Sequence, residues 1–199
     1  MAYIVAATGN QHKLSEYARL LADQDIELKS LNDFPGYTEP EENGSTFEEN
    51  AGIKAASASI YCSAPAFADD SGLVVEALDG RPGIHSSRYA PTDAERIAKL
   101  LKELEGKENR RAKFVCVIAI AFNGEVIASF EGEVTGVILD APRGENGFGY
   151  DPVFQPDGFD RSFAELSADE KNRISHRAMA YAKALEFVDE ELSALTDQF

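Results

Sequence analysis

The sequence predicts an α/β fold built around a mixed β-sheet. In the first half of the chain, short apolar strands alternate with amphipathic helices. In the second half, Asn123-Gly124 joins two long strands. Alternating strands and helices are typical of parallel βα units, whereas an Asn-Gly pair forms the tight turn of an antiparallel hairpin. A sheet that contains both kinds of connection is mixed.

The predicted elements of the first half begin with a strand and a helix. Leu14, Tyr17 and Leu21 recur at helical spacing. Thr46 and Glu49 form a capping-box pattern at the start of a second helix. In order, we expect a strand at 3–8, a helix at 11–23, a strand at 26–30, a loop at 31–45, a helix from Thr46 to 62, and short strands at 66–69 and 73–77 around a turn.

The rest of the chain contains two further capping-box patterns, Thr92 with Glu95 and Ser167 with Glu170. We expect a loop at 80–90, a helix at 93–105, strands at 113–122 and 125–138, a Gly/Pro-rich loop at 140–154 that leads into a short strand, and one last helix at 168–192.

Composition places the chain among ordinary globular proteins. It has 199 residues, of which 44% are hydrophobic and 27% charged. No apolar run approaches the ~20 residues of a membrane span, and the N-terminus lacks the features of a signal peptide. We therefore expect a single domain over 1–199, a cytoplasmic location and no membrane partner. Cys62 and Cys116 are predicted to be free structural thiols.

The charge balance restricts the partners. There are 35 acidic and 19 basic residues, which gives a formal net charge of −16. A protein that binds polymeric nucleic acid needs a basic face, so we expect no such partner. A small polyanion can still bind through clustered Lys and Arg, backbone amides or a divalent cation.

The stretch "ATGNQHK" at 7–13 is the first candidate for such binding. A strand ends there, a Gly-containing turn follows, and a helix begins. A helix N-terminus presents backbone N–H groups and a positive dipole end to an anion, and Lys13 adds a charge. The pattern is not GxxxxGK[ST] and therefore not a Walker A loop. Alone, it is a weak signal, and a capped strand-to-helix turn with a surface lysine is the favoured interpretation.

Acidic residues form the second group of candidates. Glu41 and Glu42 lie in a loop, where the helix dipole does not explain them. Asp69 and Asp70 lie between apolar flanks, and adjacent residues in an extended chain point to opposite faces. One can therefore serve a metal while the other bonds to the backbone or to a cation such as Lys54. The alternative is a polar turn between two strands.

Two later stretches carry aromatic and basic residues. In "GENGFGYDPVF" at 144–154, three glycines allow the backbone to approach a flat ligand, and Phe148 or Tyr150 can stack on a base. In "EKNRISHR" at 170–177, Lys171, His176 and Arg177 lie close together in sequence. The alternatives are a glycine-rich loop with a core aromatic and a helix with solvent-exposed charges.

In combination these stretches are specific. The sequence resembles the inosine triphosphate pyrophosphatase family through "ATGNQHK", "EENGSTFEENAGIKA", "FADDSGL", "GRPGIHSSRYA", "GFGYDPVF" and "EKNRISHR", which span roughly residues 3–182. The resemblance implies a bent mixed sheet with helices on both sides and two lobes around a central nucleotide cleft. It also implies a homodimer that uses Mg²⁺ to hydrolyse nonstandard purine nucleoside triphosphates (ITP, dITP, XTP) to the monophosphate and pyrophosphate.

The resemblance also implies roles for residues. Asp70 would be the catalytic base and a Mg²⁺ ligand, with Glu41 as the second metal-binding acid and Glu42 as its neighbour. The implied substrate contacts run from the phosphates to the base: Thr8, Gly9, Asn10, Gln11, His12 and Lys13, then Lys54 and Ser71, then Phe148, Gly149, Tyr150 and Asp151, and finally Lys171, His176 and Arg177. His85 and Ala178 depart from the family pattern, which has Tyr and Gly there.

Three alternatives remain at this point. The chain could be a related nucleotide pyrophosphatase with another base preference. It could be a non-catalytic nucleotide-binding module, although such a module need not keep Asp70 and Glu41. It could also be a structural protein with an acidic surface.

Overall fold

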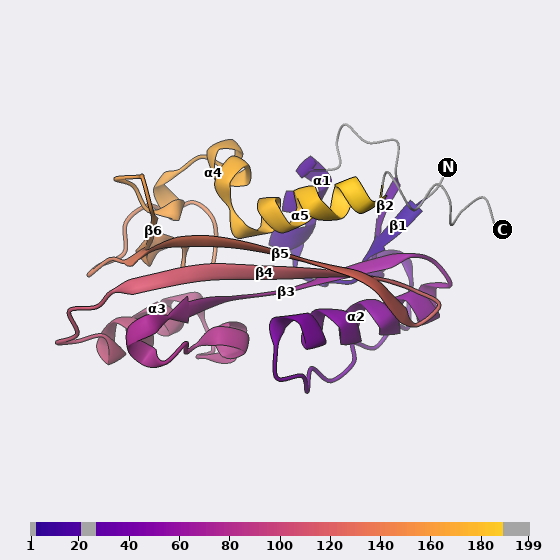
Figure 1. Cartoon of the computed structure of the whole chain (residues 1–199), viewed down its shortest axis with the longest axis horizontal. Coiled ribbons are helices and arrows are strands. Elements are labelled where there is room, and N and C mark those ends of the chain that lie inside the picture. The colour runs from indigo at the N-terminus through magenta and orange to yellow at the C-terminus, as the bar shows by residue number, and fades with distance from the viewer. Residues whose placement is uncertain (1–2, 21–26, 189–199) are drawn as a thin grey trace. The chain divides into compact units, whose positions relative to one another are not determined.

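A computed structural model describes residues 3–20 and 27–188 of the chain (Figure 1). Its elements are β1 (Tyr3–Ala6), α1 (Gln11–Leu20), β2 (Glu27–Ser30), α2 (Phe47–Cys62), β3 (Ala66–Val75), α3 (Asp93–Glu103), β4 (Arg111–Phe122), β5 (Glu125–Ile138), β6 (Phe154–Pro156), α4 (Ala168–Ile174) and α5 (His176–Phe187). Short 3₁₀ turns connect several of them, including Gly83–Arg88 and Asp151–Val153.

The sheet is mixed, as the sequence predicts. Its six strands lie in the order β2-β1-β3-β4-β5-β6. β1 pairs in parallel with β2 and β3, whereas β5 and β6 are antiparallel. Asn123 and Gly124 have φ values of 50° and 84°, the positive values that a type I′ hairpin turn requires. The α/β prediction is therefore confirmed.

The chain divides into two compact units. Of the described residues, 3–20, 27–70, 116–132 and 178–188 form unit 1, and 71–115 and 133–177 form unit 2. The prediction of a single domain over 1–199 stays a prediction, as do the bend of the sheet and the two-lobed cleft.

Unit 1 has its own hydrophobic core. Tyr17 of α1, Phe67 of β3 and Tyr181 of α5 meet there, with ring centroids 4.9–6.2 Å apart. Within this unit, α2 lies on one side of the strands and α1 and α5 on the other (Figure 1). The small residues of α2, among them Ala51, Ala55 and Ala58, are fully buried and allow close packing.

Unit 2 has a second core. Phe114 of β4, Phe154 of β6 and Phe163 pack with ring centroids 4.7–5.9 Å apart. Leu100 and Leu104 at the end of α3 belong to the same core and are fully buried. Thr92 and Ser167 cap α3 and α4 with complete capping boxes, as the sequence predicts.

Two sequence predictions about local structure are wrong. Residues 66–77 are not two strands around a turn, because β3 runs without interruption from Ala66 to Val75 through both aspartates. Ser71 and Gly72 are accommodated within the extended chain.

The last helix is divided in two by Ser175, whose φ and ψ of −72° and 152° are extended. Serine competes with helical backbone bonding and is favoured at helix ends. The predicted helix residues 21–23 and 189–192 lie outside the described residues.

Three further predictions concern the cap of α2, the two cysteines and membrane-spanning segments. Thr46 caps α2 through its hydroxyl, but the carboxylate of Glu49 accepts from the backbone and hydroxyl of Ser45. Cys62 and Cys116 are buried free thiols. No helix in the described part of the chain combines the length and apolarity needed to cross a bilayer.

Candidate functional site

The turn between β1 and α1 is organised by Asn10. Its side-chain Oδ1 accepts from the backbone N–H groups of His12 at 2.9 Å and Lys13 at 3.3 Å, so Asn10 caps the helix. Asn10 N–H in turn donates to Thr8 Oγ1 at 3.1 Å. An anion bound directly by the His12 and Lys13 amides would therefore have to displace the Asn10 side chain.

Lys13 and Asp69 form a largely buried ion pair. Lys13 Nζ lies 2.8 Å from Asp69 Oδ2, and the two side chains are 16% and 0% exposed. Residue 13 reaches this carboxylate from the first turn of α1, while Asp69 comes from β3. Asp69 is thus neutralised within the protein, and Lys13 is held at the base of the Thr8–Lys13 turn.

Lys54 of α2 gathers three oxygen groups around its ammonium. Its Nζ lies 3.3 Å from Asp70 Oδ1 and 3.1 Å from Glu42 Oε1, and it donates to the backbone oxygen of Asp69 at 2.7 Å. Burial alone would lower the pKa of Lys54, but the carboxylates of Asp70, Asp69 and Glu42 outweigh burial and raise it. Lys54 is therefore a fixed cation among these acids.

For Asp70, in contrast to Lys54, burial outweighs the nearby opposite charge in its effect on the pKa. Burial raises the pKa of Asp70, the nearby Lys54 acts against this rise, and Glu42 adds to it. The net pKa of the carboxyl lies above its ordinary value. A carboxylate that is destabilised by burial holds a proton more readily, which suits a group that must accept one from water.

Asn50 supports Asp70 from the first turn of α2. This residue is fully buried, and its Nδ2 lies 3.5 Å from Asp70 Oδ2. Its Oδ1 accepts from the backbone N–H of Gly44 at 2.9 Å, which connects the loop that carries Glu42 to the same helix. Asn50 and Lys54 are four residues apart, so they project from one face of α2.

We call Lys13, Glu42, Lys54, Asp69 and Asp70 the lysine–carboxylate cluster. Across residues 3–20 and 27–188, no three His, Cys, Asp or Glu side chains are grouped closely enough to hold a metal ion by themselves. Asp70 and Glu42 nevertheless approach one common cationic group, Lys54. Two carboxylate oxygens completed by phosphate oxygens and water are an ordinary donor set for Mg²⁺, so these residues fit that ion.

A second group of residues lies in unit 2, around the glycine-rich loop. Asp151 Oδ2 accepts from the backbone N–H of Phe148 at 3.0 Å and from Lys171 Nζ at 2.7 Å. Gly147 has a φ of 74°, and a Cβ there would overlap Asp151 Oδ2, so only glycine fits. Burial raises the pKa of Tyr150, whose neutral hydroxyl donates to the backbone oxygen of Ser86 at 2.9 Å.

The basic residues of this group are buried. Lys171, His176 and Arg177 have exposed fractions of 5%, 4% and 2%. Lys171 Nζ lies 4.8 Å and the Arg177 guanidinium carbon 5.7 Å from the centroid of the Phe148 ring. We call Phe148, Asp151, Lys171, His176 and Arg177 the aromatic–cation cluster.

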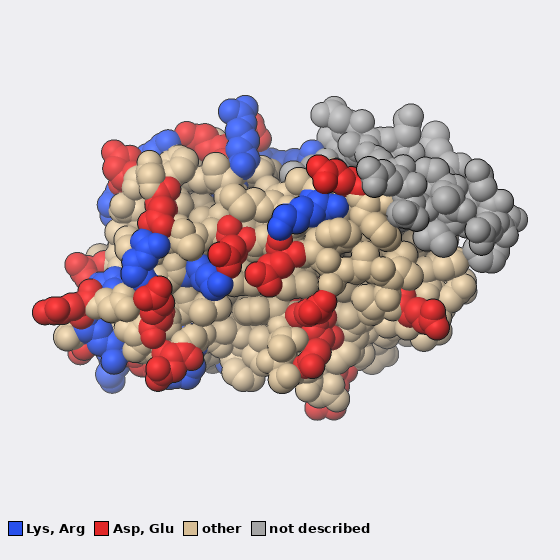
Figure 2. All heavy atoms as spheres, viewed as in Figure 1, with Lys and Arg blue, Asp and Glu red and all other residues tan. Residues whose placement is uncertain are grey.

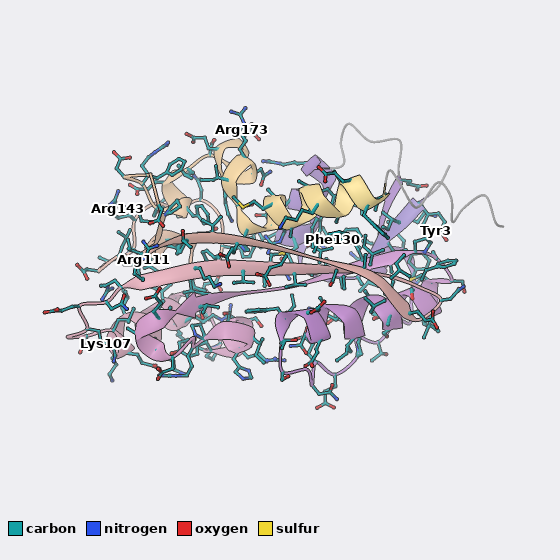
Figure 3. The ribbon with its side chains drawn as sticks, in the orientation of Figure 1. Tyr3, Lys107, Arg111, Phe130, Arg143 and Arg173 are labelled. Carbon is teal, nitrogen blue, oxygen red and sulfur yellow. The ribbon has the colours of Figure 1, made fainter. Side chains whose placement is uncertain are left out.

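His176 and Arg177 each contact a further residue of unit 2. His176 stacks on Phe114 at 4.8 Å, and Arg177 Nη2 donates to Ser71 Oγ at 3.4 Å. Arg173, two residues from Lys171 on α4, instead projects away from the ribbon (Figure 3). The alternative of a helix with solvent-exposed charges therefore fits Arg173 but not Lys171 or Arg177.

On the outer surface that Figure 2 shows, basic side chains are not gathered into a cluster as they are at these two sites. On the visible face, Lys and Arg side chains lie beside Asp and Glu and form no continuous basic strip (Figure 2). Arg111, for example, binds Asp157 through two bonds of 2.7 and 2.8 Å.

The family assignment follows from the whole chain. The model of the Ham1 family matches residues 4–187, which include every member of both clusters. This chain belongs to the Ham1 family. Among its relatives in the Ham1 family, the dITP/XTP pyrophosphatase of Deinococcus deserti is 51% identical over 90% of this chain and 86% of that protein. The dITP/XTP pyrophosphatase of Geobacillus kaustophilus is 52% identical over 92% of each chain.

Solved structures of the Ham1 family share the fold. A HAM1 protein from Coxiella burnetii is 45% identical and superposes with a TM-score of 0.89 over 96% of this chain and 100% of its own. The Staphylococcus aureus Ham1 protein is 41% identical, with a TM-score of 0.86 over 95% of this chain and 99% of its own.

The structure brings together only part of the residue set that the resemblance implies. Lys13, Lys54 and Asp70 lie in the lysine–carboxylate cluster, and Phe148, Asp151, Lys171, His176 and Arg177 form the aromatic–cation cluster. Gly9, Gln11 and His12 are exposed at the start of α1, and Glu41 is exposed beside Glu42. The assignment of Glu41 as a metal ligand stays a prediction, while Glu42 is the acid that contacts Lys54.

Asn50 is a site residue that the sequence motifs did not indicate. The signal that could have found it is its spacing of four residues from Lys54 on a helix whose other buried positions are the small residues Ala, Gly, Ser and Cys. The sequence also left open whether Asp69 faces Lys54. Its backbone oxygen contacts Lys54, but its carboxylate contacts Lys13.

Proposed function

We propose that this chain hydrolyses nonstandard purine nucleoside triphosphates (ITP, dITP and XTP) to the monophosphate and pyrophosphate, and so removes them from the nucleotide pool. The observation that carries the proposal is the buried Asp70 carboxylate beside Lys54. It lies in a Ham1-family chain about half identical to proteins named dITP/XTP pyrophosphatase.

Asp70 is the proton acceptor in this proposal. A water molecule attacks the α-phosphorus, its proton passes to Asp70, and the bond from the α-phosphorus to the bridging oxygen breaks to release pyrophosphate. The raised pKa of Asp70 favours this proton transfer. Lys54 and Lys13 supply positive charge near the reacting phosphates, which become more negative as the bond breaks.

Asp70 and Glu42 are the residues that would hold Mg²⁺. When bound, the ion neutralises phosphate charge in an otherwise acidic protein. Glu41, the acid implied by the family resemblance, remains the competing second ligand. Thr8 to Lys13 and Ser71 are proposed to contact the substrate, with Lys13 first released from Asp69.

The aromatic–cation cluster is proposed to bind the base. Phe148 provides a flat apolar surface for stacking. Arg177 has only hydrogen-bond donors, so it favours the 6-oxo acceptor of hypoxanthine or xanthine over the 6-amino donor of adenine. A buried unpaired donor costs about 1–3 kcal/mol, enough to discriminate between the two. Gly149, Tyr150, Asp151, Lys171 and His176 are proposed to complete the pocket.

Two further properties belong to the same proposal. We infer that the enzyme acts in the cytoplasm, where the nucleotide pool lies, and that it forms a homodimer as the family resemblance implies. Light scattering on the purified chain tests the dimer.

The experiment that tests the function is a substrate panel. Pyrophosphate release is measured from ITP, dITP, XTP, GTP, ATP, UTP and TTP, with and without Mg²⁺. Preferred, Mg²⁺-dependent cleavage of ITP, dITP and XTP supports the proposal. A preference for another base points to a related pyrophosphatase, and tight ITP binding without hydrolysis points to a binding module.

A further inference from the structure

The glycine-rich loop of unit 2 is tied to α3 by one carboxylate. Asp93, the first residue of α3, accepts from the backbone N–H of Gly149 through Oδ2 at 2.8 Å. Its other oxygen, Oδ1, is bound by Arg96 Nη1 at 2.6 Å. Arg96 is itself held, because its Nε donates to the backbone oxygen of Ala90 at 2.9 Å.

This bond acts on the peptide that follows Phe148. The N–H of Phe148 is fixed by Asp151, and the next N–H, that of Gly149, is fixed by Asp93. Gly149 has a φ of 63°, and apart from its two chain neighbours no atom lies within 4 Å of the position that a Cβ would take, so this residue is not closely packed there. The two carboxylates therefore define the backbone on both sides of the Phe148 ring.

Packing between α3 and the glycine-rich loop would hold the loop less firmly than the hydrogen bond from Gly149 to Asp93 does. Apart from Asp93, the α3 residues that line a groove with the loop are small or apolar: Ala94, Ile97, Ala98 and Leu101. They line an open groove with Pro142, Phe148 and Pro152. Apolar contacts across an open groove are not directional, whereas a hydrogen bond to a carboxylate fixes both distance and angle.

We propose that Asp93 is a positioning residue that sets base specificity: it holds the Gly149 amide and thereby places the Phe148 ring under the purine. The proposal rests on the proposed function and adds to it a residue that does not itself touch the substrate. Asp93 positions the Phe148 ring and not the reacting phosphate. Loss of Asp93 should therefore change KM and the discrimination between bases more than it changes kcat.

The test compares Asp93→Ala, Asp93→Asn and the wild type with ITP and ATP as substrates. Asp93→Ala should lower the ratio of kcat/KM for ITP to that for ATP by about tenfold, mainly through KM for ITP. Asp93→Asn keeps an oxygen acceptor for Gly149 but turns its Nδ2 toward Arg96, so it should restore part of the ratio. Hydrogen exchange at the Gly149 amide should be faster in Asp93→Ala than in Asp93→Asn.

Thr92→Ala is the matched control. It removes the N-cap of α3, where Thr92 Oγ1 accepts from the Glu95 amide, but leaves Asp93 in place. If Asp93 acted only by stabilising α3, Thr92→Ala would reduce the ITP/ATP ratio as well, and the proposal would be overturned.

The outcomes separate this proposal from the proposed function. A wild-type enzyme without preference for ITP would overturn both. Two outcomes would overturn only the role of Asp93. In the first, Asp93→Ala leaves the preference for ITP unchanged. In the second, Asp93→Ala lowers kcat for every substrate along with the preference.

Discussion

Asp69 and Asp70 are consecutive residues of β3, yet their carboxylates contact different lysines. Asp69 Oδ2 lies 2.8 Å from Lys13 Nζ, and Asp70 Oδ1 lies 3.3 Å from Lys54 Nζ. The alternation of side chains along a strand accounts for this separation. The Asp69 side chain is fully buried and neutralised, whereas that of Asp70 keeps 11% of its surface exposed. We infer that Asp69 supports the site and Asp70 performs the chemistry.

The first prediction concerns the Lys13–Asp69 pair. Asp69→Asn should lower the free energy of unfolding by about 3 kcal/mol, because removal of one partner leaves a largely buried charge uncompensated. The double variant Lys13→Met/Asp69→Asn should recover part of this loss. Urea denaturation of the two single variants and the double variant measures the coupling. Strictly additive effects would show that the pair does not stabilise the fold.

The second prediction concerns catalysis by Asp70. Asp70→Asn should reduce kcat for ITP at least a hundredfold, because the amide cannot accept the proton from water. Affinity for ITP should remain measurable by calorimetry, since most substrate contacts are unchanged. Near-normal release of pyrophosphate by this variant would rule out Asp70 as the proton acceptor.

Much of the fold could be predicted from the sequence, because its signals are local. Asn123-Gly124 requires a hairpin, and Thr92 and Ser167 cap helices through bonds that span three residues. The continuous β3 and the break at Ser175 could not be predicted in this way. Ser71-Gly72 is compatible with either a turn or a strand, and a serine such as Ser175 occurs both inside helices and at their ends, so tertiary packing decides in each case.

The site was predictable in its residue types but not in its pairings. Asp70, Lys54 and Lys13 stand out as charges beside apolar segments. That Lys13 pairs with Asp69, and that Glu42 rather than Glu41 reaches Lys54, depends on backbone paths between residues far apart in sequence. Such pairings are a property of the folded chain alone.

The third prediction compares two adjacent acids. Glu42→Gln should raise the Mg²⁺ concentration needed for half-maximal activity at least tenfold, because Glu42 and Asp70 approach the same cationic group. Glu41→Gln, the matched control, should change it less than about threefold, because Glu41 is exposed. Titration of activity with Mg²⁺ measures both. The reverse order would assign the metal to Glu41, as the family resemblance implies.

The fourth prediction concerns stability in acid. Arg111 and Thr135 bind Asp157 and lower its pKa from 3.8 to about 2. A carboxyl group with a lowered folded-state pKa stabilises the protein above its unfolded-state pKa, and this contribution is lost as pH falls from about 4 to about 2. Asp157→Asn should therefore be less stable than wild type at pH 6 and lose less stability over that interval. The effect should be small because the pair is exposed.

Thermal melts at several pH values between 2 and 6 measure this difference. Asp160→Asn, an exposed aspartate in the same loop, is the control and should follow the wild-type curve. Parallel curves for wild type and Asp157→Asn would contradict the prediction.

The fifth prediction concerns recognition of the base by Arg177. Arg177→Ala should lower kcat/KM for ITP at least tenfold and for ATP much less, because only ITP offers an oxygen acceptor at position 6 of the purine. Arg173→Ala is the control, since Arg173 is exposed and projects away from α4 (Figure 3).

Arg177 is buried, so its loss can also weaken the fold, and the comparison is made well below the melting temperature of each variant. Equal losses for ITP and ATP would show that Arg177 holds the pocket together without distinguishing the base. A selective loss for ITP would show that its donors do distinguish the 6-oxo group.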